Sequence, residues 1–188
     1  MKSVDKANNA IQSLIDDFKK CPNKYLTEDD VRIHLCHLLM NDFSEIEKTE
    51  DNDCSISLHT EVRWWGDKHL KYRSDIVLFD VSDMQVTKKK ILELKNHTQK
   101  GYSANKIKGV IEIKFRRNKG DSDKQFLKKI GSDCNKLGEI KTMLEIGGKN
   151  KNTFYCLIVL DKKQNMKDKL NNLIYVRYEF ANEYCENT

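Results

Sequence analysis

The spacing of apolar residues predicts two helices at the start of the chain. Between residues 4 and 20, apolar side chains recur every three or four positions, which is the period of one helix face. Cys21-Pro22-Asn23 ends this first helix. Thr27 is then a favourable N-cap with Asp30 as its box-like partner, and the second helix runs to about Met40. Its apolar stripe consists of Val31, Leu35, Leu38 and Leu39.

Beyond the polar and acidic residues 41–53, which are predicted to form a loop, the pattern changes to the alternation and apolar runs of strands. The predicted strands cover residues 56–63, 72–81, 107–115, 154–160 and 173–180. Ser122–Leu144 forms an amphipathic helix between the third and fourth strands. Residues 83–106 are predicted to be an extended connection in which Ile91–Leu94 could add a short strand.

The resulting order is two helices, three strands, one helix and two strands. It contains no internal repeat and no domain boundary. We therefore expect one α/β domain over residues 1–188, with helices in residues 1–44 packed on a sheet in residues 54–182. A helix that joins two strands by a crossover makes a mixed sheet the expected arrangement.

Composition adds a bias in charge to this picture. The 188 residues suit one hydrophobic core, and the net charge is +5. Residues 83–131 alone contain fourteen Lys or Arg against five Asp or Glu, a net charge of +9. Such a segment suits a polyanionic partner, although a solvated lysine-rich surface would give the same count.

Several classes of function are not supported by the sequence. The six cysteines form no CxxC pair, so we expect reduced thiols rather than a zinc site. No phosphate-binding glycine loop is present. No hydrophobic segment opens the chain, so no signal peptide or membrane span is expected, and a cytoplasmic location is predicted.

The candidate chemistry lies in the predicted strands. Glu-x-Lys occurs three times, beginning at Glu93, Glu112 and Glu139. In a helix, residues two apart point to different sides, which disfavours Glu139. In the strand over 107–115, Glu112 and Lys114 share one face, opposite to the apolar residues. Asp75 interrupts another apolar strand, which is costly unless the carboxylate has a partner.

Asp75 and Glu112 could together bind a hard divalent cation through oxygen ligands if their strands are neighbours. Such an ion polarises a phosphate and activates water. Lys114 beside it could orient that water or stabilise the charge of the transition state. These are the components needed for phosphodiester hydrolysis.

With these residues the sequence resembles the PD-(D/E)xK, or restriction endonuclease-like, nuclease superfamily. The resemblance rests on Arg73-Ser74-Asp75-Ile76-Val77-Leu78 and Gly109-Val110-Ile111-Glu112-Ile113-Lys114-Phe115, and on the element order from residue 27 to about 161. It implies an αβββαβ core after one extra N-terminal helix. It also implies Asp75 and Glu112 as ligands of Mg²⁺ or Mn²⁺, Lys114 as the catalytic lysine, and DNA as the substrate, with RNA less favoured.

The resemblance also suggests that an acidic residue on the helix before the sheet joins the site. Glu28 is our choice, since it lies at helical spacing with Val31 and Leu35 and should face the sheet. A first-turn acid favoured by the helix dipole is the alternative explanation.

The sequence departs from the family pattern in two places. Ser74 replaces the proline of the motif, and the gap between Asp75 and Glu112 is long. A shorter gap would select Glu93-Leu94-Lys95 instead. We prefer Glu112 because its strand is longer and leads directly into the helix and the next buried strand.

Five residues are predicted to contact nucleic acid: Arg73, Arg116, Arg117, Lys119 and Gln125. An exposed helix-start glutamine is an equal alternative for Gln125. Glu61 could approach the metal, but an ion pair with Arg63 or Arg73 is favoured. Trp64-Trp65 is expected to pack within the sheet or a hairpin rather than to stack on bases. Cutting both strands would favour a homodimer. A catalytically silent module that binds nucleic acid or protein is the alternative function.

Overall fold

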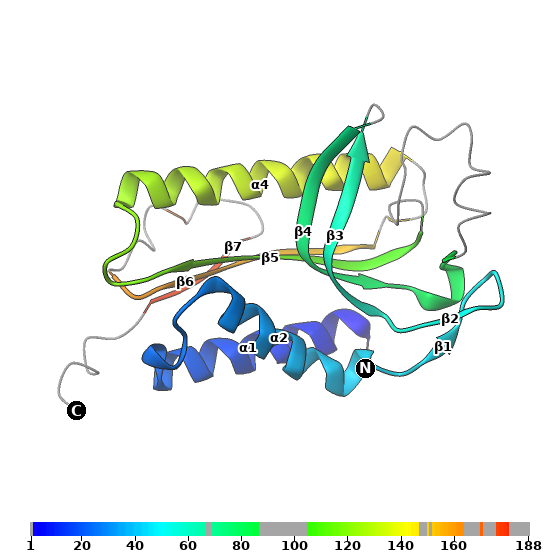
Figure 1. Ribbon diagram of the computed structural model, residues 1–188, viewed down its shortest axis with the longest axis horizontal. Coiled ribbons are helices and arrows are strands. Elements are labelled where there is room, and N and C mark those ends of the chain that lie inside the picture. The colour runs from blue at the N-terminus through cyan, green and yellow to red at the C-terminus, as the bar shows by residue number, and fades with distance from the viewer. Residues whose placement is uncertain are drawn as a thin grey trace.

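Three long helices cover the two faces of a five-stranded sheet in the portion of the chain that the structure describes (Figure 1). The structure is a computed structural model, and it describes residues 2–66, 69–86, 105–146, 150, 152–163, 170 and 176–180. The helices are α1 (Ser3–Lys20), α2 (Glu28–Phe43) and α4 (Asp123–Ile146). The strands of the sheet are β3 (Leu58–Gly66), β4 (His69–Phe79), β5 (Ile107–Arg116), β6 (Phe154–Asp161) and β7 (Val176–Phe180).

The strands lie in the order β3-β4-β5-β6-β7. The pairs β3–β4 and β4–β5 are antiparallel, whereas the pairs β5–β6 and β6–β7 are parallel. Helix α4 connects β5 to β6 across one face, which is the connection that a parallel pair requires. The predicted α/β class, crossover helix and mixed sheet are therefore confirmed.

The predicted start of α2 is confirmed in atomic detail. The hydroxyl of Thr27 accepts the Asp30 N–H at 3.2 Å, and the Asp30 carboxylate accepts the Thr27 N–H at 2.8 Å, which makes a reciprocal capping box. Two short 3₁₀ turns, η1 (Pro22–Lys24) and η2 (Val81–Asp83), lie in the connections.

The prediction of a loop over residues 41–53 is partly wrong. Helix α2 continues to Phe43, because that side chain is buried in the core and gives the last turn something to pack against. Strands β1 (Glu47–Lys48) and β2 (Cys54–Ser55) then pair antiparallel. Thr49 closes the turn between them, since its N–H and hydroxyl both bond to the backbone of Asp53.

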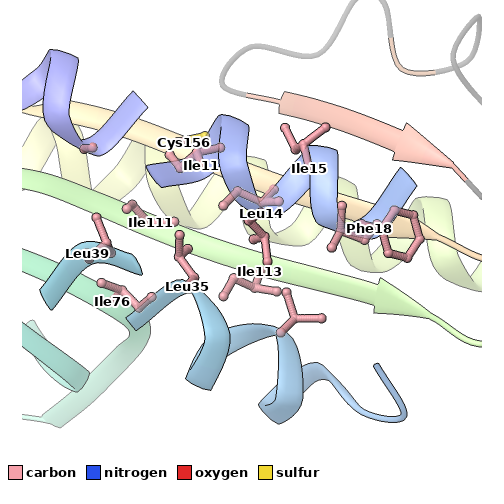
Figure 2. Close-up of a cluster of buried hydrophobic side chains, with 14 of the residues drawn as sticks. Ile11, Leu14, Ile15, Phe18, Leu35, Leu39, Ile76, Ile111, Ile113 and Cys156 are labelled. Carbon is pink, nitrogen blue, oxygen red and sulfur yellow. The ribbon is translucent and has the colours of Figure 1, made fainter. Parts of the chain in front are cut away.

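The sheet carries a separate hydrophobic core on each face. Helices α1 and α2 pack on one face against side chains that include Ile76, Ile111 and Ile113 (Figure 2). Helix α4 packs on the other face against a second set that includes Val110 and Val159. Alternate residues of β5 thus enter opposite cores, as the pleat of a strand dictates.

Trp64 is fully buried in the core beneath α4, and its indole N–H donates to the Ser74 hydroxyl at 2.8 Å. It packs within the hairpin as predicted. The Trp65 side chain, the predicted strand at 91–94 and the alternative motif Glu93-Leu94-Lys95 lie outside the described residues. Among the described helices, none is both long and apolar enough to cross a membrane.

Arg116 does not fit its predicted contact with nucleic acid. Its side chain has no exposed area and forms a two-pronged ion pair with the equally buried Asp161 at the end of β6. It also reaches Asp123 at 2.7 Å, and its guanidinium lies over the Phe126 ring. The residue therefore ties the ends of β5 and β6 to the start of α4.

Replacing Arg116 with Met should destabilise the fold by about 3–5 kcal/mol, because the buried carboxylate of Asp161 would lose its cationic partner. The exposed neighbour Arg117, replaced in the same way, should change stability by less than about 0.5 kcal/mol. Urea unfolding followed by circular dichroism measures both. Equal effects of the two substitutions would contradict this role of Arg116.

Candidate active site

The two strands that carry the candidate motif separate at Asp75. Strand β4 pairs with β5 only over Ile76–Phe79, although it stays paired with β3 as far as His69. Asp75 is the first residue beyond this fork. Its Oδ2 accepts the N–H of Ile113 at 2.8 Å, so a side chain takes the place of the missing strand partner.

Glu28 has the same role two residues further along β5. From the first turn of α2, its Oε2 accepts the N–H of Phe115 at 3.2 Å. Its Oε1 lies 3.3 Å from the ammonium of Lys114. The prediction that Glu28 faces the sheet is confirmed.

Glu112 and Lys114 lie on the face of β5 opposite to Ile111 and Ile113, as their alternation predicted. Glu112 is only 1% exposed. The structure thus brings Glu28, Asp75, Glu112 and Lys114 together from α2, β4 and β5. Their chemical roles stay predictions.

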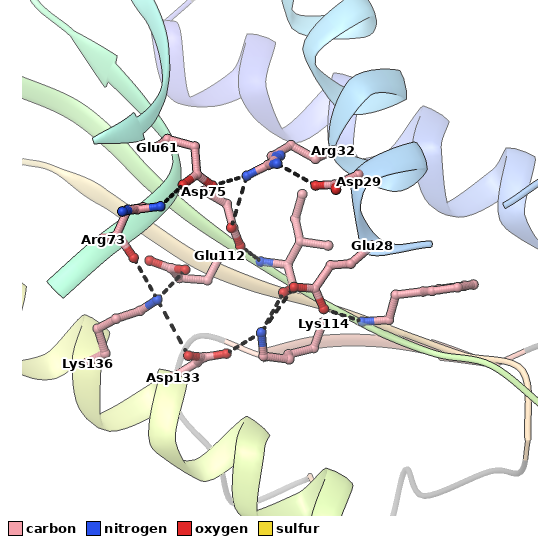
Figure 3. A network of polar contacts seen from close by, with 12 residues as sticks. Glu28, Asp29, Arg32, Glu61, Arg73, Asp75, Glu112, Lys114, Asp133 and Lys136 are labelled. Carbon is pink, nitrogen blue, oxygen red and sulfur yellow. Dashed lines mark hydrogen bonds and ion pairs between the residues drawn. The ribbon is translucent and has the colours of Figure 1, made fainter. Parts of the chain in front are cut away.

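Helix α4 adds two residues that the sequence prediction missed. Lys136 Nζ lies 2.6 Å from Glu112 Oε2, and Asp133 Oδ2 lies 3.1 Å from Lys114 Nζ (Figure 3). Asp133 and Lys136 are also 3.5 Å apart, one helical turn from each other. A signal for Asp133 exists in the sequence, because it stands in helical register with the buried Ile130 and Leu137.

The acidic groups of the site repel one another. Burial raises the pKa of Glu112 to about 8, and the charge of Asp75 adds to this, while Lys136 and the Ser74 hydroxyl oppose it. Although Ser74 lies close, Glu112 Oε1 has no donor in hydrogen-bonding geometry. The pKa of Glu28 is raised by burial and by Asp75, against the opposing effect of Lys114.

Lys114 is held firmly as a cation. Burial opposes its charge, but Asp133 and Glu28 outweigh that cost and raise the pKa of its ammonium above the ordinary value. The site therefore contains a permanent positive charge beside Glu28 and Glu112, the two carboxyl groups whose pKa is raised.

Glu61 organises a second group of charges at the edge of the site. Its carboxylate binds Arg32 and also accepts from Arg73 at 2.9 Å, which confirms the expected pairing with Arg73. Arg32 in turn lies 3.8 Å from Asp75 Oδ1. Glu61 has a φ of 54°, which is rare outside glycine and marks strained backbone in β3 next to the site.

The remaining residues predicted to contact nucleic acid lie in three places: on β4, in the turn after β5 and at the start of α4. Arg117 and Lys119 are exposed in the turn after the strand, and Arg73 is half-exposed. Gln125 has a structural role, because its side chain accepts the N–H and hydroxyl of Ser122 just before α4. This is the helix-start alternative for Gln125.

The candidate metal ligands are the carboxylates of Asp75 and Glu112. No group of three His, Cys, Asp or Glu side chains is arranged as a metal site within the described ranges. Protein cations instead contact the carboxylates: Lys136 on Glu112, Arg32 near Asp75 and Lys114 on Glu28. The donor set nevertheless fits Mg²⁺, since Glu112 Oε1 is buried without a hydrogen bond and Asp75 is near enough to raise the pKa of Glu112.

Comparisons with known proteins do not identify the chain. No family model matches it, and neither the curated proteins nor the solved structures contain a significant match. The geometry of the site therefore has to carry the functional argument.

Replacing Glu112 with Gln should stabilise the protein increasingly as the pH rises. The folded pKa of about 8 exceeds the ordinary value of 4.5, so the cost of the buried charge is absent below pH 4.5 and complete above pH 8. We expect a gain on the order of 2–4 kcal/mol at pH 9 and little at pH 4. Thermal unfolding across this range measures it.

Glu145→Gln is the matched control, because Glu145 is an exposed glutamate near the end of the same helix that supplies Lys136. It removes one carboxylate from an exposed position and should give no comparable gain in stability at pH 9. If the difference in stability between Glu112→Gln and wild type stayed constant between pH 4 and pH 9, the charge of Glu112 would not be destabilising the fold.

Proposed function

We propose that this protein is a metal-dependent nuclease of the restriction endonuclease-like type that hydrolyses phosphodiester bonds in DNA. The observation that carries the proposal is the fork between β4 and β5. It places Asp75 beside Glu112 and Lys114 and brings Glu28 in from the preceding helix. The order α2-β3-β4-β5-α4-β6 supports it, since this is the αβββαβ core that the sequence resemblance implies, preceded by α1.

Asp75 and Glu112 would hold the ion, Mg²⁺ or Mn²⁺, through carboxylate oxygens. When bound, the ion would polarise the scissile phosphate and make a water molecule easier to deprotonate. Glu28 is a further oxygen donor at the rim, although in the structure both of its oxygens are engaged by β5.

Lys114 is suited to bind the negative charge that develops on the phosphate. It is a permanent cation, and its ammonium is fixed between Glu28 and Asp133 rather than free to rotate. Charges fixed in advance stabilise a transition state without a cost of reorganisation at the moment of reaction. Arg73, half-exposed at the edge of the site, could hold the phosphate on one side of the scissile bond.

Substitution of Asp75 by Asn or of Lys114 by Met should reduce cleavage at least about 100-fold while the fold is retained. Plasmid and single-stranded DNA, with RNA in parallel, are incubated with Mg²⁺ or Mn²⁺ and with EDTA. Asp42→Asn and Lys128→Met are the matched controls, since Asp42 lies near α1 and Lys128 is exposed on α4. Full activity in Asp75→Asn would exclude this site.

Salt-sensitive binding without cleavage would favour the alternative, a catalytically silent nuclease-fold module. That alternative has support in the structure, because Lys136 and Arg32 already lie against the two carboxylates. Sedimentation with and without duplex DNA would test for the dimer that cutting both strands favours.

Arg117 and Lys119 are proposed to contact the phosphate backbone, because both are exposed beyond the end of β5. Arg117→Met and Lys119→Met should each weaken binding of any DNA sequence and reduce the slope of log affinity against log salt by about 1. Fluorescence anisotropy at several salt concentrations measures the slope. The buried Arg116 offers no such contact, and unchanged slopes in both variants would move the binding surface elsewhere.

A further inference from the structure

A lysine on α4 lies directly against Glu112, one of the two candidate metal ligands. Lys136 Nζ lies 2.6 Å from Glu112 Oε2 in a position that is mostly screened from solvent. A divalent cation at Glu112 would place a second positive charge within a few ångströms of this ammonium. Two cations that share one buried carboxylate repel each other strongly, because solvent screens them little.

We propose that Lys136 is a built-in competitor of the divalent ion, which occupies Glu112 in the empty site and must move away for the ion to bind. This rests on the proposed metal-dependent function. Lys136 would thus keep Glu112 compensated when no ion is present, and it would lower the affinity of the site for metal.

The surroundings of Lys136 give it a place to move. Its ammonium is already 3.0 Å from the carbonyl oxygen of Arg73 and 3.5 Å from Asp133 Oδ1 (Figure 3). Both are acceptors that do not belong to the proposed metal ligands. The exchange needs only a rotation of a flexible side chain, which loses one partner and keeps two.

The same movement would affect Lys114. Asp133 contacts Lys114 through Oδ2 and Lys136 through Oδ1. If Lys136 moves from Glu112 towards Asp133, it competes with Lys114 for that carboxylate. Glu28 would then remain as the acidic partner that holds the Lys114 ammonium in place.

The test is calorimetric titration of the whole chain with Mn²⁺ and with Mg²⁺, without nucleic acid. Lys136→Met should bind the ion at least about tenfold more tightly than wild type, because the competing charge is gone. Lys136→Arg keeps a cation and should stay within about threefold of wild type. Lys128→Met removes the same charge from an exposed position of α4 and should have no such effect.

Equal or weaker binding by Lys136→Met would overturn the proposal, because the lysine would then support the ion rather than compete with it. An absence of binding to both wild type and Lys136→Met would overturn it as well. Should Lys136→Met lose its native circular dichroism, Lys136→Gln is titrated in its place. The cleavage assay separates the two proposals: metal-dependent cutting with unchanged affinity in Lys136→Met leaves the nuclease standing without the competition.

Discussion

Two backbone N–H groups of β5 lose their strand partner where β4 turns away. The site depends on the side-chain carboxylates that accept these two hydrogen bonds in place of a strand. A buried N–H without an acceptor is costly, so something must replace the missing carbonyl groups. Asp75 accepts from Ile113 and Glu28 accepts from Phe115. The need to satisfy these two N–H groups thus fixes two carboxylates at the edge of β5. Both lie within reach of Glu112 and Lys114, because these residues alternate with Ile113 and Phe115 along the strand.

The carboxylates gathered in this way have to be compensated by positive charge. Lys114 lies between Glu28 and Asp133, Lys136 between Glu112 and Asp133, and Arg32 between Glu61 and Asp75. Compensation is incomplete, because the pKa of Glu112 remains raised to about 8. The strained backbone at Glu61 lies in the same region. Strain and unfavourable charge concentrated at one place are typical of a site that is kept for function rather than for stability.

The features of this arrangement that depend on local pattern could be predicted from the sequence. The period of two in β5 puts Glu112 and Lys114 on one face, and the cap at Thr27 sets the phase of α2, which turns Glu28 towards the sheet. The contributions of α4 depend on which strand faces which turn of the helix, and a single sequence does not contain that register. The prediction for Arg116 fails for a related reason: the run Arg116-Arg117-Asn118-Lys119 looks uniformly solvated, yet the last residue of β5 points inwards to Asp161.

The buried ion pairs of this protein differ in one respect that bears on function. Arg116 and Asp161 match each other with two parallel hydrogen bonds, and each is also engaged elsewhere, Arg116 by Asp123 and Asp161 by the N–H of Lys163. Lys136 and Glu112 meet through a single oxygen, and the other oxygen is buried without a hydrogen bond. An ammonium is a point charge that gains little from a fixed geometry, so it can be exchanged for another cation more readily than a guanidinium fork. The first pair therefore holds the ends of the strands together, whereas the second is compatible with the proposed exchange of Lys136 for a metal ion.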